Sequence, residues 1–581
     1  MDKEKIIWID RMKVIENIYR ISLVLISAIN LIVMHYTIGR YTEVPYETTS
    51  YIDNVLGVII DILILDSIFL FLFKGNIRLS LLICNIITAA WSFSNVLYSR
   101  FFFQYISISS IGQANNILNT SMLRCIIDGI QWSDLLFAVT IILSFIIFFN
   151  TEYKFIGTKK IIRTFVISII TIFILIVMNT VIYSLKTTET RSIGYIKHHL
   201  YVHHMDLYRN SANPNWTHFQ RGTIRTILHP IIHKLFSTKT LSEEQTKIIN
   251  EELYNQNKKV TTHLKSDVEN VIFIIIESYL SAVSDLYVAN REITPNLNAL
   301  KKDPTVLYNG KVKSNITIGE SGDGQFICMT GLLPLRSEIT VGRAKDVTLP
   351  GLPKILSKKM NLHTRMLIPT TPSMWEQERM CVQYGIEKLF SSIDFKSGKE
   401  DLNDEEIFDY LQSLDKDEPR PFFSLVLTMS MHQPYTKQID PTFNIKDPNK
   451  SNNYINYLNA CHYTDKQIGK YLQSLKECDL YKKSLIIITA DHHPNPNSLQ
   501  MDTVSNMIPL YIINGNINGQ EWADNCNQLD IYTTVLDLLI KDHLEWRGLG
   551  NSLLTQDYKY SVNTSKWDIS EWILQSNFLN K

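Results

Sequence analysis

Two apolar segments far apart in the chain each end on side chains that commonly bind metal ions. Residues 271–276 are continuously apolar and are followed by Glu277, and the largely apolar run at 485–490 is followed by Asp491 and His492. Runs of this length are typical of parallel strands covered on both faces. Since ligands of open α/β sheets bind beyond the carboxyl ends of the strands, the two ends predict one site. The plainer alternative for the second end is a helix-capping aspartate beside a surface histidine.

A glycine-rich segment between these two ends carries a candidate nucleophile. Residues 319–326 read Gly-Glu-Ser-Gly-Asp-Gly-Gln-Phe, and residues 326–333 can form a helix whose N-terminus points at Ser321. The free N–H groups and the dipole of a helix N-terminus stabilise an anion. A serine so placed could attack phosphorus or sulfur, although a glycine-rich segment taken alone is more often a plain loop.

A serine hydroxyl is a poor nucleophile until something lowers its pKa, and a divalent metal ion can do so. We predict that Glu277, Asp491 and His492 hold such an ion, with Ser321 as the fourth ligand. Two carboxylates and one imidazole suit Zn²⁺ or Mn²⁺, with Mg²⁺ also open, because ligand chemistry alone does not choose among them. The chain is therefore a candidate metalloenzyme.

A third strand-like run precedes a histidine that could touch a substrate. His432 follows the run at 422–428, so its side chain could donate a proton to a phosphoryl oxygen or to a leaving group. A loop histidine without a catalytic role is the alternative.

The part of the chain after residue 265 alternates short apolar runs with amphipathic segments. Strand-like runs also occur at 364–368 and 508–513, and helical spacing occurs at 454–475 and 529–540. This alternation predicts an α/β domain over residues 266–581, with a mainly parallel sheet covered by helices.

The first 186 residues form a different kind of domain, dominated by long apolar runs. Each run approaches the ~20 apolar residues that span a bilayer. We expect five transmembrane helices, near residues 15–35, 52–74, 79–98, 134–150 and 163–185. The third is interrupted by polar residues and the fourth is short, so either could instead be a buried core helix.

The distribution of basic residues sets the orientation of these helices. Lysine and arginine are concentrated before the first run and in the second-to-third and fourth-to-fifth connections, which predicts that these parts are cytoplasmic. Five crossings then place the polar linker at 187–265 and the domain at 266–581 outside the cytoplasm. We expect a multi-pass protein of the plasma or inner membrane.

The overall composition gives no support for nucleic-acid binding and does not determine whether the cysteines are paired. The formal net charge is zero, so there is no electrostatic case for nucleic-acid binding. Five of the seven cysteines lie after residue 265, and no CxxC pair is present. We interpret them mostly as buried free thiols.

Several of these motifs together resemble a known family, the membrane-bound sulfatase-like transferases of the alkaline phosphatase superfamily. Lipoteichoic acid synthases are most similar, followed by phosphoethanolamine transferases. The matching segments are the strand ending in Glu277, Thr294-Pro-Asn-Leu, and residues 319–326, in which Ser321 stands where the synthases have a threonine nucleophile. True sulfatases instead carry a Cys/Ser-x-Pro-x-Arg motif, which Ser321 lacks.

The resemblance also implies substrate contacts. His432 matches a family histidine that contacts the substrate phosphate, and Trp375 matches a substrate-contacting tryptophan, with core packing as the alternative. The family arginine two residues after that tryptophan is Gln377 here, so we expect Arg379, or alternatively Arg365, to supply the missing cation.

These observations lead to one expected function and two alternatives. We expect a metal-dependent transferase that moves glycerol phosphate or phosphoethanolamine from a phospholipid donor to a glycan or glycolipid acceptor through a covalent Ser321 intermediate. One alternative is a sulfatase- or phosphatase-type hydrolase at the cell surface. The other is an inactive sensor or binding protein on the same fold.

Overall fold

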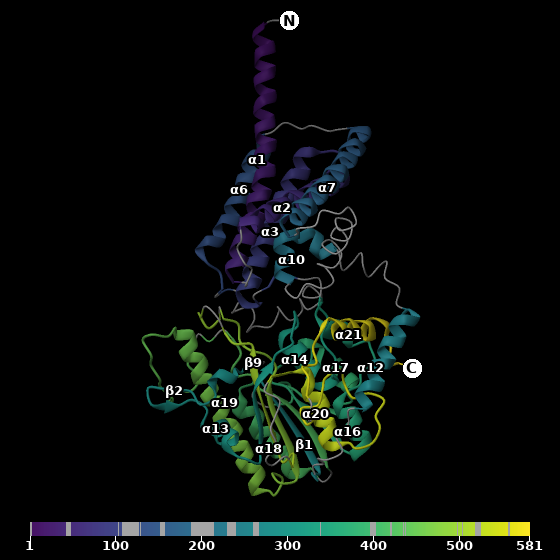
Figure 1. The fold of residues 1–581 in the computed structure, drawn as a ribbon. Coiled ribbons are helices and arrows are strands. Elements are labelled where there is room, and N and C mark those ends of the chain that lie inside the picture. The colour runs from purple at the N-terminus through teal and green to yellow at the C-terminus, as the bar shows by residue number, and fades with distance from the viewer. Residues whose placement is uncertain are drawn as a thin grey trace. The chain divides into compact units, whose positions relative to one another are not determined.

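The structure is a computed structural model that describes residues 3–41, 48–102, 104–106, 127, 129–150, 157–187, 214–228, 240–258, 267–336, 338–395, 402–418, 421–433, 435, 437–496, 498–501, 504–516, 525–555 and 558–580. The described residues form two compact units, one up to residue 228 and the other from residue 240 on (Figure 1). We refer to them as the membrane unit and the catalytic unit.

The membrane unit consists of helices. Their bounds are α1 (Lys3–Tyr41), α2 (Thr48–Leu72), α3 (Ile77–Phe102), η2 (Trp132–Asp134), α6 (Leu135–Phe149), α7 (Thr158–Thr187) and α10 (Pro214–Arg221). Among the described residues, four segments are long and apolar enough to cross a membrane: Asn17–Arg40, Tyr51–Leu72, Ile77–Arg100 and Trp132–Phe149. They coincide with the first four predicted spans. The fifth predicted span lies in α7, whose C-terminal side chains fall outside the described residues.

The polar residues that interrupt the third span lie inside the membrane unit. Asn85, Ser92, Asn95 and Ser99 are each 0% exposed, and Ser27 of α1 donates a hydrogen bond to the Asn85 side chain. Polar side chains on a spanning helix are tolerated when they face neighbouring helices and bond to them. These residues therefore do not argue against a membrane span.

Part of the predicted linker at 187–265 belongs to the membrane unit. Helix α10 packs against α2, and the backbone N–H of Ile224 donates to Asp61 of α2 at 3.1 Å. Most of residues 187–239 lie outside the described residues, and α12 (Glu243–Lys258) belongs to the catalytic unit.

The catalytic unit is built on an eight-stranded sheet in its described part. The strand order is β10 (Cys526–Asn527), β4 (Leu307–Lys313), β9 (Met507–Ile513), β8 (Ser484–Ala490), β1 (Asn270–Ile276), β7 (Phe422–Leu427), β5 (His363–Leu367) and β6 (Lys388–Phe390). All neighbouring strands are parallel except β9, which runs antiparallel to β8 and β4. A separate two-stranded sheet is formed by β2 (Tyr287–Val288) and β3 (Arg291–Glu292).

Helices cover both faces of this sheet (Figure 1). One group contains α13 (Pro295–Lys302), α18 (Asp404–Asp417) and α19 (Asn452–Glu477), and the other contains α14 (Glu320–Thr330), α16 (Leu352–Met360) and α20 (Leu529–Leu539). The remaining elements are η4 (Ser281–Val283), α15 (Thr340–Ala344), η5 (Met374–Glu376), α17 (Gln377–Tyr384) and α21 (Thr564–Ser576). Every residue of β1 and β8 is buried, which confirms the prediction of a mainly parallel sheet covered by helices.

The described cysteines are free thiols, as expected. They are Cys84, Cys328, Cys381, Cys461, Cys478 and Cys526. Cys478 is half-buried and the other described cysteines are buried.

Candidate active site

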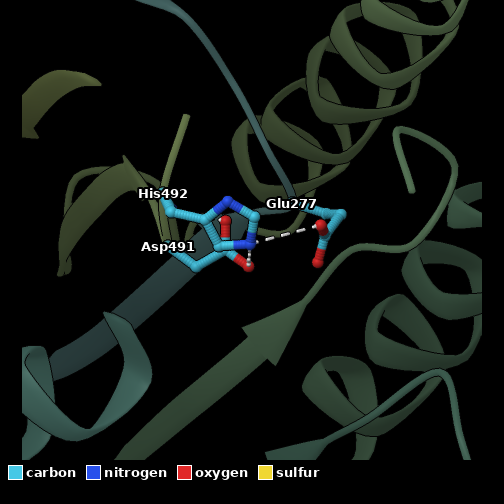
Figure 2. A group of neighbouring side chains, drawn as sticks. All are labelled: Glu277, Asp491 and His492. Carbon is cyan, nitrogen blue, oxygen red and sulfur yellow. Dashed lines mark hydrogen bonds and ion pairs between the residues drawn. The ribbon is translucent and has the colours of Figure 1, made fainter. Parts of the chain in front are cut away.

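The two strand ends singled out in the sequence lie side by side. Strands β1 and β8 pair in parallel with Ile276 opposite Ala490, so the next residue of each strand, Glu277 and Asp491, reaches the same edge of the sheet. One ligand atom from each of Glu277, Asp491 and His492 lies within 4.8 Å of the others. Figure 2 shows the imidazole of His492 turned toward both carboxylates. All three residues are at most 7% exposed.

The orientation of the His492 ring suits it to bind a cation. Its Nδ1 lies 2.8 Å from the carbonyl oxygen of His493, and only an N–H can satisfy that acceptor. In the neutral ring the proton therefore sits on Nδ1, and the lone pair of Nε2 faces Glu277 and Asp491, each 3.6 Å away. A backbone carbonyl that fixes the tautomer in this way is a common feature of metal-binding histidines.

The hydroxyl of Ser321 completes the cluster. Its Oγ lies 3.1 Å from Glu277 Oε2 and 3.1 Å from His492 Nε2. The predicted position of the helix needs a correction, because α14 begins at Glu320 and holds Ser321 in its first turn. Gly319 is the N-cap and Glu320 the first helical residue, so the helix begins six residues earlier than the apolar pattern indicated.

Close packing brings this helix turn against the end of β8. A Cβ atom on Gly324 would lie 2.2 Å from the carbonyl oxygen of Asp491, so only glycine allows the approach. The loop ahead of the helix is held by Asp323, whose carboxylate accepts hydrogen bonds from the backbone N–H groups of Thr317 and Gly319 at 3.0 and 2.9 Å. The glycines of the motif thus serve contact with the neighbouring strand as well as the approach of a ligand.

The buried charges of the cluster shift one another's pKa values. Burial and the charge of Glu277 raise the pKa of Asp491 to about 8. Burial alone would lower the pKa of His492, but the charges of Asp491 and Glu277 raise it to about 9. Burial alone would raise the pKa of Glu277, yet His492 and His432 hold it below its usual value. Asp491 and His492 therefore hold protons near neutral pH while Glu277 stays ionised, and a bound divalent ion would displace those protons.

His432 reaches this site from the loop after β7. The ring is exposed, and its Nδ1 lies 2.7 Å from the carbonyl oxygen of Gln433, which leaves Nε2 available to a ligand. A positive charge on this ring would favour the ionised form of Glu277. The structure thus places His432 within electrostatic range of Glu277.

Trp375 lies beside the serine turn. A Cβ atom on Gly322 would be 3.2 Å from Cε3 of Trp375, so the indole packs directly against the residue after Ser321. Trp375 and Glu376 both have left-handed φ values, 50° and 55°. Such backbone is uncommon in residues with side chains and is concentrated at functional sites. The indole is half-buried, which leaves part of it available to a ligand.

Arg379 is not brought to the serine. Its guanidinium pairs with Asp346 at the surface, where both side chains are more than half exposed. The reason is helical geometry. Gln377 is on the buried face of α17, and a residue two positions later in a helix points to nearly the opposite side. Gln377 instead exchanges two hydrogen bonds with Gln325, at 3.0 and 2.7 Å.

The sequence did not single out several residues that support the site. Thr428 accepts a hydrogen bond from the backbone N–H of Glu277 at 3.0 Å, and Gln528 donates to the carbonyl oxygen of Asp491 at 2.7 Å. Ser278 contacts both carboxylates. Glu320, adjacent to the nucleophile, has a pKa raised by burial to about 7. Of these residues, only Ser278 and Glu320 could have been noticed in the sequence, because each is adjacent to a predicted site residue.

Comparisons with known proteins match both parts of the chain. Residues 269–539 match the Sulfatase family, and residues 7–201 match the lipoteichoic acid synthase N-terminal domain. The chain is thus lipoteichoic acid synthase-like in its N-terminal part and sulfatase-like in its second half.

Curated relatives of this lipoteichoic acid synthase-like chain include two lipoteichoic acid synthases. It is 27% identical over 317 residues to lipoteichoic acid synthase 2 of Bacillus subtilis, covering 51% of this chain and 48% of that protein. It is 24% identical over 533 residues to lipoteichoic acid synthase of Staphylococcus saprophyticus, covering 85% of this chain and 78% of that protein. The first match thus spans about half the length of that relative. A crystal structure of a Listeria monocytogenes lipoteichoic acid synthase has a TM-score of 0.44 at 18% identity, covering 56% of this chain and 97% of that one.

The lipoteichoic acid synthase-like chain is therefore a sulfatase-superfamily enzyme with a membrane-bound N-terminal part. Its four candidate spans make it a multi-pass membrane protein. Its buried Glu/Asp/His cluster could bind a metal ion.

Proposed function

We propose that this chain is a metal-dependent transferase that moves a phospho-headgroup from a phospholipid to a glycan or glycolipid outside the cytoplasm. The single observation that supports this most is the position of Ser321 Oγ, 3.1 Å from both a carboxylate and an imidazole of a buried acidic cluster. A hydroxyl at a helix N-terminus next to such ligands is equipped to attack phosphorus.

Glu277, Asp491 and His492 would hold one divalent ion, with the Ser321 hydroxyl as the fourth ligand. The donor set of two carboxylates and one imidazole nitrogen fits Mn²⁺ or Zn²⁺. Such an ion, when bound, lowers the pKa of the hydroxyl and neutralises charge on a phosphoryl oxygen. His492 is oriented for this role by the His493 carbonyl.

The first half of the reaction transfers the headgroup to the enzyme. Ser321 Oγ forms a bond to the donor phosphorus as its proton passes to a neighbouring acceptor, for which Glu277 Oε2 is in reach at 3.1 Å. The bond between phosphorus and the diacylglycerol oxygen breaks, and the leaving oxygen takes a proton, which His432 Nε2 would supply. The product is a phosphodiester on Ser321 together with free diacylglycerol.

The second half releases the headgroup to the acceptor. A hydroxyl of the acceptor attacks the same phosphorus, the bond to Ser321 Oγ breaks, and the serine regains a proton. Trp375, packed against Gly322, would form one wall of the pocket that holds the headgroup. Water in place of the acceptor would make the enzyme a hydrolase.

Two candidate donors fit this chemistry. The curated relatives are lipoteichoic acid synthases, which favours glycerol phosphate. The replacement of a cation by Gln377 near Trp375, and its engagement with Gln325, differs from the expected pattern and keeps phosphoethanolamine as the second donor.

The topology supports a site outside the cytoplasm. With α7 as a fifth crossing and the N-terminus inside, the catalytic unit follows an odd number of spans. The substrates would then meet the enzyme at the outer surface of the membrane.

The proposal is tested with the full chain in vesicles. Phosphatidylglycerol and phosphatidylethanolamine carrying headgroup label are supplied separately with Mn²⁺ or Zn²⁺, and diacylglycerol and transferred label are measured. We expect diacylglycerol from one donor, a loss of at least about a thousand-fold in Ser321→Ala, and retained activity in Ser321→Thr, which keeps a hydroxyl. Ser474→Ala removes a buried helix hydroxyl elsewhere in the unit and should stay active. Wild-type activity in Ser321→Ala would contradict the nucleophile.

A further inference from the structure

We infer that Ser278 is the positioning residue that joins the two strand ends and sets the spacing of their carboxylates. This rests on the proposed metal site and extends it to a residue that is not itself a ligand. Ser278 follows Glu277 directly and is 4% exposed.

Its polar groups reach both strands. The Ser278 hydroxyl donates to Glu277 Oε1 at 2.6 Å, and its backbone N–H donates to Asp491 Oδ1 at 2.8 Å. One residue thus bonds one oxygen of each carboxylate. Of the remaining oxygens, Glu277 Oε2 accepts from Ser321 and Asp491 Oδ2 lies 3.6 Å from His492 Nε2, while Glu277 Oε1 lies 3.6 Å from the same nitrogen.

This division of oxygens has a chemical consequence. A carboxylate with one oxygen held by a donor can rotate little, so the other oxygen stays directed at the ion. Hydrogen bonds to ligating carboxylates orient them and tune affinity in metal sites generally. Loss of the bond should therefore weaken metal binding without removing a ligand.

The backbone at Ser278 is what makes the double contact possible. Its φ is +50°, in the left-handed region that residues with side chains seldom adopt. The turn directs the N–H of Ser278 across to Asp491, while the side chain remains next to Glu277. Glycine would take this conformation more easily, so a serine here indicates that the hydroxyl has a use.

A buried tyrosine forms hydrogen bonds with the backbone of the turn that contains Ser278. The hydroxyl of Tyr457 on α19 donates to the carbonyl oxygen of Ser278 at 3.0 Å and accepts from the backbone N–H of Leu280 at 3.1 Å. Tyr457 is 0% exposed. All three polar groups of Ser278 are therefore occupied, two by metal-type ligands and one by the core.

The test measures metal binding directly, apart from transfer activity. Metal-stripped full-length protein in detergent is titrated with Mn²⁺ and with Zn²⁺ by calorimetry, comparing wild type with Ser278→Ala and Ser278→Gly. Alanine loses the hydroxyl and keeps the unfavourable φ, whereas glycine loses the hydroxyl and relieves the φ. Ser474→Ala is the matched control for loss of a buried hydroxyl.

We expect both Ser278 variants to bind the ion roughly 10- to 100-fold more weakly, and the control to bind as wild type does. Weak binding in Ser278→Ala with normal binding in Ser278→Gly would show that strain, rather than the hydroxyl, is responsible and would overturn the inference. Equal affinity in all four proteins would also overturn it. Absence of binding in the wild type would instead contradict the proposed metal-dependent function itself.

Discussion

At the scale of residues, the site is a buried cluster with more negative than positive charge. Glu277, Asp491 and His492 lie within 4.8 Å of one another at their ligand atoms, and Ser321 bonds two of them. Buried carboxylates are unfavourable unless a cation or a proton accompanies them. In the metal-free protein only protons can neutralise these carboxylates, so the stability of the protein should depend on pH.

We expect the metal-free protein to lose stability from about pH 4 to pH 9, with both Asp491 and His492 contributing to the loss above about pH 6.5. The pKa of His492 is raised from 6.5 to about 9, and that of Asp491 from 3.8 to about 8. A raised pKa in the folded state stabilises the protein below the unfolded value, and this contribution is lost as the pH rises through the folded value. The lowered pKa of Glu277 acts only at acid pH, so it does not offset the loss.

The melting temperature of the metal-stripped protein, measured across this pH range with and without Mn²⁺, checks the expectation. Because the ligands must be deprotonated to bind, the increase in Tm caused by the ion should grow with pH. The variant His492→Gln should flatten both trends. A Tm of the metal-free wild type that rises from pH 6.5 to 9 would contradict the assigned protonation.

Sequence reasoning identified the members of the cluster but not the residues that support them. Glu277, Asp491 and His492 were visible because each follows an apolar run at the end of a strand. Ser278 and Gln528 were not, because their roles depend on a left-handed φ and on a contact between distant segments. Arg379 was chosen by proximity in sequence to Trp375, and the helical period places it on the opposite side of α17.

At the scale of elements, the approach of α14 to the end of β8 determines the site. Gly324 allows this approach, since a Cβ atom would meet the Asp491 carbonyl oxygen at 2.2 Å. The backbone of Asp491 could not accommodate a Cβ atom at that distance unless the helix or the strand moved. Ser321 lies on the same helix, so it would move as well.

Gly324→Ala should therefore separate Ser321 from the metal ligands. We expect a loss of at least about tenfold in both metal affinity and headgroup transfer, since misplacement by about 1 Å can cost about a hundredfold in rate. Gly342→Ala on the nearby helix α15 is the control, because nothing lies within 4 Å of a Cβ atom there. Calorimetry and the transfer assay give the readout, and wild-type values for Gly324→Ala would show that the close approach is unnecessary.

The fold was predictable where apolar runs are long and not where strands are short. Strands β1, β5, β7, β8 and β9 match runs in the sequence. Strand β6 has three residues and β10 has two, too few for any periodicity to show. Strand β4 carries Asn309, Gly310 and three charged or polar neighbours, so its place in the sheet follows from pairing with β9 rather than from its own composition.

At the scale of the whole molecule, a multi-pass membrane part precedes the catalytic unit. The arrangement suits an enzyme whose donor and leaving product are both lipids, because attachment to the bilayer raises the local substrate concentration. This benefit requires that the catalytic unit and the donor headgroup be on the same side of the membrane.

The side can be tested with single cysteines. Asn449→Cys lies at an exposed position of the catalytic unit, and Lys74→Cys lies at an exposed position between α2 and α3. We expect a membrane-impermeant maleimide to label the first in intact cells and the second only after permeabilisation. The described native thiols are buried or half-buried, so the unsubstituted chain gives the background. The reverse labelling pattern would contradict the assigned topology.

The central claim is that Ser321 carries the headgroup during transfer, and one measurement addresses it directly. Metal-loaded protein is mixed with phosphatidylglycerol or phosphatidylethanolamine without acceptor, quenched in acid, digested and examined by mass spectrometry. The account predicts a peptide containing Ser321 that bears one phosphoglycerol or phosphoethanolamine group, with the added group identifying the donor, and no such peptide from Ser321→Ala. Diacylglycerol release with an unmodified Ser321, or modification of another residue at the site, would contradict it.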